Sequence, residues 1–386
     1  MPRLPCSLLK SARSEEFLLP LLLRVCRSLP SARNELRWLR ERAVAVASQK
    51  APTDPKQWRP IFRHLCELRS RGRPLQYILG DQPFGDLDIL CKPGVLIPRP
   101  ETEAYTTHLA KLLVHNLLSN GRRADQSPLS LRILDLCTGT GCIPLLLHSL
   151  LSSHIEDFTC VGIDISPLAL SLARCNLRWN VQRGKLMARA QKDIQFLQAD
   201  VLANSHATPN DANSLQTLLR ALPQSENPPQ FGILISNPPY ISPRDFNTTT
   251  SRSVRNWEPK LALVPPNVCS ESGRSPDPAS TDPALLIEDT FYPHLLATAT
   301  AVNAKVLVLE VSDLAQALRV AALAQKNGDW DGIEIWRDWP SGHVSQGPTR
   351  EVKAMVGGQN ICIVGRGNGR AVVCWKGDGG SWLGKT

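Results

Sequence analysis

From residue 131 onward, short apolar runs of strand length alternate with helical segments, and this alternation constrains the fold more than any other feature. Helical segments, notably Ile143–Leu151 and Pro167–Asn180, lie between several of the runs. Strands that alternate with crossover helices form a mostly parallel sheet covered on both faces. We therefore predict an α/β fold with a doubly wound sheet. The predicted strands are Leu131–Leu136, Thr159–Ile163, Ile194–Leu197, Phe231–Ser236, Val306–Val311 and Gly332–Arg337, with Arg370–Trp375 as one more.

The first predicted strand runs directly into a glycine-rich turn, in the sequence ILDLCTGTGC that begins at Ile133. Gly139 and Gly141 let the backbone approach a ligand closely, and the N-terminus of the following helix offers free N–H groups to an anion. No Gly-Lys-Ser/Thr follows, which excludes a phosphate-binding P-loop, and the third glycine of a dinucleotide fingerprint is absent. An acid, Asp135, precedes the turn, a pattern typical of S-adenosylmethionine enzymes. A purely structural strand-to-helix turn is the alternative interpretation.

Two further acids close predicted strands. Asp164 ends the second strand, where an acid accepts hydrogen bonds from ribose hydroxyls in doubly wound folds, although it is also a common helix cap. Asp200 follows the third strand and would lie near the adenine edge of a bound nucleoside. The series of strand-end acids supports a nucleoside-containing cofactor.

The sequence ISNPPYIS, from Ile235, follows the fourth predicted strand. Ligands in such sheets bind beyond the carboxyl ends of the strands. The successive prolines Pro238 and Pro239 restrict the backbone, so the Asn237 side-chain oxygen and the Pro238 carbonyl can each accept an N–H from an amide or exocyclic amine. The ring of Tyr240 can pack against that planar group. Because such acceptors would be left unpaired by a carboxylate, the site predicts selection against glutamate; a simple proline turn is the alternative.

The chain before residue 101 predicts a helical domain and a linker. Apolar residues recur at spacings of three and four, with prolines between the helices, and a Gly- and Pro-rich stretch then predicts a β-hairpin. Polar segments without periodicity interrupt the later alternation and are expected to be surface insertions. The expected parts are a helical domain at 1–73, a hairpin linker at 74–100, a catalytic domain at 101–376 with insertions near 181–192, 203–230 and 265–283, and a flexible tail at 377–386.

Composition narrows the remaining classes. The formal net charge is +9, but no run of five like charges occurs, so we expect no direct nucleic-acid partner. No apolar run approaches the roughly 18 residues of a membrane span, and we expect no membrane association. The 11 cysteines form no CxxC pair, and we expect neither a metal site nor disulfides. The arginine-rich start resembles a mitochondrial transit peptide in part, although Glu15 and Glu16 depart from that pattern; the alternative is the first helices of a folded domain.

With these motifs the chain resembles the peptide chain release factor N(5)-glutamine methyltransferases, the HemK/PrmC family. The glycine-rich loop and NPPY occur in several amino-methylating enzymes, but other segments single this family out, and the likeness covers most of residues 60–375. These segments are RPLQYILGDQPFGDLDI from Arg73, GVLIPRPETE from Gly94, VRNWEPKLAL from Val254, Arg337-Asp338, and Arg370-Ala371-Val372.

The resemblance implies a Rossmann-like class I methyltransferase fold, with a helical N-terminal domain that helps to hold a release factor. It implies that S-adenosyl-L-methionine methylates the glutamine of the factor's Gly-Gly-Gln loop, and it favours a mitochondrial member, with a cytoplasmic location as the alternative. The implied cofactor-binding residues are Asp135, Cys137, Thr138, Gly139, Thr140, Gly141, Asp164, Asp200 and Asn237. The implied substrate-binding residues are Asn237, Pro238, Pro239 and Tyr240, of which Asn237, Pro238 and Tyr240 are assigned to catalysis.

Three features depart from the family pattern or invite another interpretation. Cys137 replaces the first loop glycine, so the backbone there must avoid a positive φ or accept strain. Val201 stands where bacterial members often carry an aromatic residue. The tripeptide Gly357-Gly358-Gln359 matches the substrate sequence, which we interpret as a coincidence.

Two other functions remain as alternatives. A nucleic-acid adenine methyltransferase would share the NPPY chemistry, but the sequence contains no base-recognition domain. A non-catalytic assembly protein on a methyltransferase scaffold would not need an intact NPPY motif or Asp164.

Overall fold

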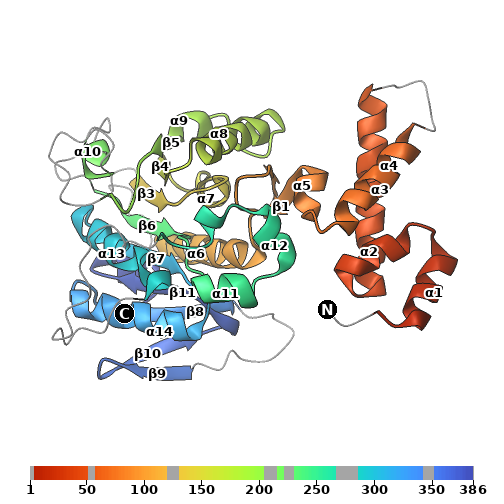
Figure 1. Cartoon of the computed structure of the whole chain (residues 1–386). Coiled ribbons are helices and arrows are strands. Elements are labelled where there is room, and N and C mark those ends of the chain that lie inside the picture. The colour runs from red at the N-terminus through yellow and green to blue at the C-terminus, as the bar shows by residue number, and fades with distance from the viewer. Residues whose placement is uncertain are drawn as a thin grey trace. The chain divides into compact units, whose positions relative to one another are not determined.

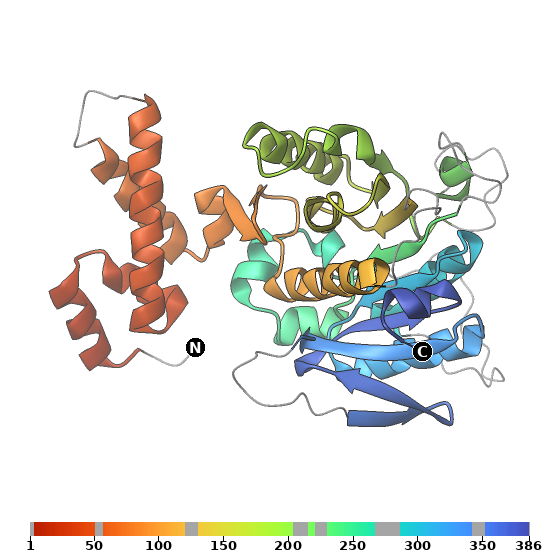
Figure 2. The same cartoon turned by 180° about the vertical axis from the view of Figure 1, so that it is seen from behind.

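The structure is a computed structural model, and it describes residues 4–50, 57–119, 130–203, 215–220, 230–266, 286–341 and 352–385. The chain forms two compact units (Figures 1 and 2). The first, which we call the helical unit, comprises Met1–Gln82, Leu90–Ile97 and Thr249–Pro259. The second, the sheet unit, comprises Pro83–Ile89, Pro98–Thr248 and Lys260–Thr386.

The helical unit is built around a leucine-rich core. Leu22, Leu23 and Leu39 are fully buried in it, and Ala12 near the start of the chain is also fully buried. An ion pair between Arg69 and Glu35, with 2.6 Å between Nε and Oε2, joins two of its helices. The helices are α1 (Cys6–Glu15), α2 (Leu19–Cys26), α3 (Leu29–Lys50), α4 (Trp58–Ser70), α5 (Leu75–Leu79) and α12 (Arg252–Trp257).

Two distant segments of the chain complete the helical unit. The Tyr77 hydroxyl donates to the Val95 carbonyl at 2.8 Å, and the Ile97 N–H donates to the Glu258 carboxylate at 3.1 Å. Trp257 packs on the small apolar cluster that contains Tyr77 and Ile97. These buried contacts bring segments near residues 77, 95 and 257 together, so the unit extends beyond the helical range 1–73 expected from sequence.

The sheet unit alternates strands and helices, and all seven strands predicted from sequence are confirmed to within a few residues. The hairpin strands β1 (Asp81–Phe84) and β2 (Leu87–Leu90) form a separate two-stranded sheet. The strands of the main sheet are β3 (Ser130–Leu136), β4 (Asp157–Asp164), β5 (Ile194–Gln198), β6 (Ile233–Ser236), β7 (Val306–Glu310), β8 (Gly332–Trp339), β9 (Val352–Val356), β10 (Gln359–Val364) and β11 (Arg366–Trp375). The helices are α6 (Pro100–Ser119), α7 (Cys142–Leu151), α8 (Pro167–Gln182), α9 (Ala190–Asp193), α10 (Leu215–Arg220), α11 (Pro243–Thr248), α13 (Phe291–Ala301), α14 (Leu314–Asn327) and α15 (Asp378–Trp382), with short 3-10 turns at Lys260–Ala262 and Ile287–Asp289.

The main sheet has the strand order β5-β4-β3-β6-β7-β11-β8-β10-β9. Strands β3 to β7 are parallel, β11 is antiparallel to both of its neighbours, and β9 is antiparallel to β10. The chain proceeds outward in one direction from β3 through β4 to β5, and in the other from β6 to β7. The order therefore reverses between β3 and β6, which is where ligands bind in doubly wound sheets.

Each face of the sheet carries its own core. In β7, Val306 and Val308 belong to one cluster, whereas Leu307 and Leu309 belong to the other. Side chains of α6, α7 and α8 fill the first cluster and those of α13 and α14 the second, in agreement with the arrangement of these helices in Figures 1 and 2. A strand buried on both faces forms a nearly continuous apolar run, which explains residues Val306 to Leu309 of β7.

Two segments are more tightly packed than their sequences indicate. Residues 181–192, expected to be a surface insertion, contain the end of α8 and the start of α9, and Leu186 and Ala190 are buried in the core. The glycine-rich end, expected to be a flexible tail, forms α15, and Leu383 is 2% exposed. Both differences arise because a few apolar side chains in a polar or glycine-rich segment reach an existing core. The other two expected insertions, 203–230 and 265–283, lie largely outside the described residues.

The strands β9 and β10 were not expected from sequence. They form a hairpin whose two-residue turn is Gly357-Gly358, with φ angles of +52° and +82°. Two positive φ angles at the turn match the twist of hairpin strands and favour glycine at both positions. Among the described residues, no helix is long and apolar enough to cross a membrane.

Candidate active site

The glycine-rich loop connects β3 to α7 at the point where the strand order reverses. Its backbone adopts positive φ angles at Cys137 (+63°), Gly139 (+56°) and Gly141 (+77°). The Thr138 N–H donates to the Ile163 carbonyl on β4, and the Gly141 N–H donates back to the Thr138 carbonyl, both at 2.9 Å. Cys137 therefore accepts backbone strain, the second of the two outcomes that the sequence left open.

The two loop glycines meet different surroundings. A Cβ atom on Gly139 would have no atom within 4 Å, whereas one on Gly141 would lie 2.8 Å from the Phe196 ring. Gly139 thus borders open space at the end of the sheet, while Gly141 is needed for close packing of the loop on β5.

Asp164, at the end of β4, holds this loop in place. One of its oxygens accepts the Gly139 N–H at 2.8 Å, and the other accepts the Ser166 N–H at 2.9 Å. Burial raises the pKa of Asp164, and the backbone N–H donors oppose that rise by stabilising the charged form. Asp164 and the glycine-rich loop, both predicted from sequence, are therefore joined by a hydrogen bond.

Asp135 and Asp200 occupy different positions from Asp164. Asp135 is fully buried beneath the loop, and burial raises its pKa to about 8, against the opposing effect of the Thr138 hydroxyl. Asp200, after β5, accepts the Leu202 N–H at 2.8 Å and so shapes its own turn. Val201, at the position noted above, is 8% exposed.

The Asn-Pro-Pro-Tyr segment follows β6, whose last residue, Ser236, is the register partner of Leu136 at the end of β3. The Ser236 hydroxyl also donates to the Leu136 carbonyl at 2.7 Å. The segment and the glycine-rich loop therefore leave neighbouring strands at the same edge of the sheet. The Asn237 side-chain nitrogen contacts the Thr102 hydroxyl at 3.4 Å, and the Tyr240 hydroxyl donates to Glu310 at 2.9 Å.

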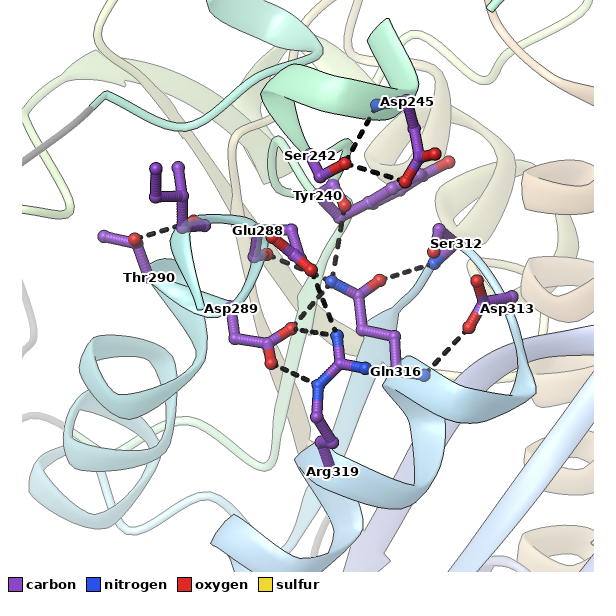
Figure 3. Close-up of polar contacts among 11 residues, drawn as sticks. Tyr240, Ser242, Asp245, Glu288, Asp289, Thr290, Ser312, Asp313, Gln316 and Arg319 are labelled. Atoms are coloured by element: carbon purple, nitrogen blue, oxygen red, sulfur yellow. Dashed lines mark hydrogen bonds and ion pairs between the residues drawn. The ribbon is translucent and has the colours of Figure 1, made fainter. Parts of the chain in front are cut away.

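A polar network around Gln316 anchors the Tyr240 backbone carbonyl (Figure 3). The buried Gln316 side chain lies at its centre, with its Nε2 atom 3.3 Å from the Tyr240 carbonyl and 2.9 Å from the Asp289 carboxylate. Arg319 in turn pairs with Asp289 at 2.6 Å. The Gln316 oxygen accepts the Ser312 N–H at 2.7 Å, so both ends of this amide are bonded. The network connects the end of the Asn-Pro-Pro-Tyr segment to α14 and to the 3-10 turn before α13.

The structure adds Glu310 to the site residues expected from sequence. Its partners Thr102 and Arg370 lie in segments that single out the family. Glu310, the last residue of β7, is fully buried and accepts hydrogen bonds from Tyr240 and, at 2.7 Å, from Thr102. Burial raises the pKa of Glu310, while the Thr102 hydroxyl and the Arg370 charge oppose the rise. Arg370 is held by Asp338 at 2.8 Å. The sequence signal for Glu310 is an acidic residue at the end of an apolar strand, the same pattern that predicts Asp164.

The tripeptide Gly357-Gly358-Gln359 lies outside this site. Because β10 is parallel to β8, and β11 is antiparallel to both β8 and β7, β10 runs in the same direction as β7. Gln359, the first residue of β10, is therefore at the opposite edge of the sheet from the carboxyl ends of the parallel strands. This position agrees with the interpretation of the tripeptide as a coincidence.

Comparison with known proteins identifies relatives with named activities. No protein-family model matches the chain. The mitochondrial MRF1 N(5)-glutamine methyltransferase MTQ1 of Saccharomyces cerevisiae is 37% identical over 265 residues, which cover 68% of each chain. The probable mitochondrial counterpart in Schizosaccharomyces pombe is 39% identical over 203 residues, or 52% of this chain and 55% of the relative. The release factor glutamine methyltransferase of Chlorobaculum tepidum is 33% identical over 205 residues, or 53% and 57%.

Solved structures resemble the chain only distantly. The N-terminal domain of human METTL16 in complex with SAH has a TM-score of 0.42 at 13% identity, covering 80% of this chain and 82% of that one. The human methyltransferase 10 domain containing protein has a TM-score of 0.37 at 10% identity, covering 88% and 96%. Similarity at this level carries no functional information.

The fold and the site together define a Rossmann-like class I methyltransferase. The 37% identity to MTQ1 extends over two thirds of both chains. The chain belongs to the release factor N(5)-glutamine methyltransferase family.

Proposed function

We propose that this enzyme transfers the methyl group of S-adenosyl-L-methionine to the side-chain nitrogen of the glutamine in the Gly-Gly-Gln loop of a peptide chain release factor. The observation that carries the proposal is the adjacency of the two segments at the switch point: the glycine-rich loop after β3 and Asn-Pro-Pro-Tyr after β6, joined by the Ser236 to Leu136 hydrogen bond at 2.7 Å. A methyl donor and a methyl acceptor held by these segments would meet at one edge of the sheet.

The residues after β3 and β4 fit S-adenosyl-L-methionine. The open space beside Gly139 leaves room for a ligand at the N-terminus of α7, where the helix dipole favours a carboxylate. Asp164 is only partly buried and can accept ribose hydroxyls in addition to its backbone donors. Ile165, which follows it, is 44% exposed and offers an apolar surface to a nucleoside. Asp135 is buried and would support the loop from below.

The residues after β6 fit a planar amide. The Asn237 oxygen and the Pro238 carbonyl would accept the two N–H bonds of the glutamine side chain, and the Tyr240 ring would pack on its plane, with Pro239 stiffening the turn. The bound cofactor supplies an electrophilic methyl group on a positively charged sulfur. The amide nitrogen is a poor nucleophile, so the role of the protein is alignment and exclusion of water. Such positioning contributes on the order of 7–11 kcal/mol to lowering a barrier.

We also propose a mitochondrial location, supported by the names of the two yeast relatives. A release factor of that compartment would then be the partner. Fractionation of cells that express the tagged full chain tests this proposal, and recovery in the cytosol alone would contradict it.

The activity is tested by incubating the purified enzyme and S-adenosyl-L-methionine with a purified release factor, followed by mass spectrometry of the Gly-Gly-Gln peptide. We expect one added methyl on the glutamine with wild-type enzyme. We expect none with Asn237→Ala, which should still bind the cofactor because Asp164 and the glycine-rich loop are unchanged. Methylation of DNA or RNA in place of the release factor would redirect the assignment to a nucleic-acid adenine methyltransferase. Failure to bind the cofactor would indicate a non-catalytic scaffold.

A further inference from the structure

A chain of hydrogen bonds connects Asn237 to a buried carboxylate. The Asn237 Nδ2 atom lies 3.4 Å from the Thr102 hydroxyl, which lies 2.7 Å from the Glu310 carboxylate. Thr102 is 1% exposed and Glu310 is fully buried, so the bond between these two residues is shielded from water. The three residues come from α6, the segment after β6 and the end of β7.

With Glu310 ionised, the donors and acceptors in this series of hydrogen bonds allow only one direction. An ionised carboxylate is purely an acceptor, so Glu310 takes the hydroxyl hydrogen of Thr102 on one oxygen and that of Tyr240 on the other. Burial raises the pKa of Glu310, whereas the Thr102 and Tyr240 hydroxyl donors and the Arg370 charge oppose that rise by stabilising the ionised form. Since the Thr102 hydrogen is already used, its oxygen can only accept from Asn237. Asn237 must therefore turn its NH₂ group toward Thr102.

This direction decides what Asn237 presents to a substrate. The two ends of an asparagine amide have nearly the same shape, so shape alone does not determine which end faces outward. With the NH₂ group directed at Thr102, the Oδ1 atom faces away from it, as an acceptor. A glutamine amide brings N–H donors to such an acceptor, whereas a glutamate carboxylate brings only further acceptors.

We propose that Glu310 and Thr102 are positioning residues that set the orientation of the Asn237 amide and thereby make the site select glutamine over glutamate. The proposal rests on the function proposed above and adds to it the origin of its specificity. Neither residue contacts the reacting atoms. Thr102 acts through Asn237, and Glu310 acts through Thr102 and also holds the Tyr240 hydroxyl.

The substitution Glu310→Gln tests the direction while preserving shape. An amide at position 310 that turns its NH₂ group toward Thr102 donates to the Thr102 oxygen, which then donates its own hydrogen to the Asn237 oxygen. Asn237 would turn its NH₂ group toward the substrate, so that donors face donors. Leaving buried donors unpaired lowers kcat/KM for the glutamine substrate by roughly 10- to 100-fold.

The experiment uses the full-length enzyme and two forms of one release factor, with glutamine or with glutamate at the third position of Gly-Gly-Gln. Methyl transfer to the glutamine form is measured as kcat and KM, and the glutamate form is added as a competitor. Glu310→Gln is accompanied by Thr102→Val, which removes the link, and by Thr102→Ser, which retains the hydroxyl. Glu334→Gln is the matched control, because Glu334 is another buried carboxylate, 4% exposed, that bonds Trp336 and Lys385 instead.

With wild type, Thr102→Ser and Glu334→Gln, we expect the glutamate form to compete only weakly with the glutamine form. With Glu310→Gln and Thr102→Val we expect slower transfer and a smaller ratio between the affinities for the glutamine and glutamate forms. A general loosening of the fold would weaken both forms alike and leave that ratio unchanged.

Two results would overturn the assignment in distinguishable ways. If wild type methylates the glutamine form and both Thr102→Val and a folded Glu310→Gln keep the wild-type ratio, the positioning role is wrong while the proposed function stands. If wild type binds S-adenosyl-L-methionine but leaves the release factor unmodified, the proposed function is wrong, and this inference falls with it.

Discussion

Replacing each loop glycine by alanine separates the packing role of Gly141 from the ligand-facing role of Gly139. Both residues have positive φ angles, +77° and +56°. An added Cβ on Gly141 would lie 2.8 Å from the Phe196 ring and 3.1 Å from the Ala173 side chain, whereas one on Gly139 would meet nothing within 4 Å. The two substitutions share a backbone penalty and differ in steric conflict.

The expected magnitudes follow from these contacts. Left-handed backbone at a residue with a Cβ atom costs about 1–2 kcal/mol in both variants. Overpacking adds about 1–3 kcal/mol at Gly141 only. A unit of this size shifts its melting temperature by about 2–4 °C per kcal/mol. We therefore expect Gly141→Ala to melt several degrees below Gly139→Ala in the absence of cofactor.

Cofactor binding should follow the opposite order. The methyl group of Gly139→Ala would project into the open space where we propose that S-adenosyl-L-methionine binds, so this variant should lose affinity despite its smaller loss of stability. Circular dichroism melts and isothermal titration calorimetry with S-adenosyl-L-methionine measure the two properties separately, with the calorimetry performed well below either melting temperature.

Either of two outcomes would refute the reasoning. Equal melting temperatures for the two variants would mean that Phe196 yields without cost and that Gly141 is not required for packing. Wild-type cofactor affinity in Gly139→Ala would mean that the open space beside this residue is not the binding site.

Two further predictions concern the same loop. Because Cys137 has a φ of +63°, Cys137→Gly should be more stable than Cys137→Ala by about 1 kcal/mol in chemical denaturation, and the reverse order would contradict the strain at this position. Since the pKa of Asp135 is raised to about 8 in the folded protein, its contribution to stability is fully present below its unfolded value near 4 and is lost as pH rises through about 8. Between pH 5 and pH 8, the free energy of unfolding of Asp135→Asn should therefore fall less than that of wild type. An equal fall in the two proteins would refute this.

Much of the sheet could be predicted from sequence because its signals are local. Apolar runs of strand length and the glycines after β3 depend on neighbouring residues only, so the order and nature of these elements followed from the pattern. The hairpin of β9 and β10 was not expected, although Gly357-Gly358 between two short runs that contain apolar residues is itself a hairpin signal.

The fold class and the family could be predicted from sequence because the alternation of strands and helices and the contiguous glycine-rich and Asn-Pro-Pro-Tyr motifs are all local signals. Only the tertiary structure joined Thr102 to Glu310, 208 positions apart, and both to the Asn-Pro-Pro-Tyr segment. The physical reason is that hydrogen-bond direction is a property of a closed set of donors and acceptors in a buried space. No local pattern specifies which distant side chains complete that set, so the orientation of Asn237 was decided by folding.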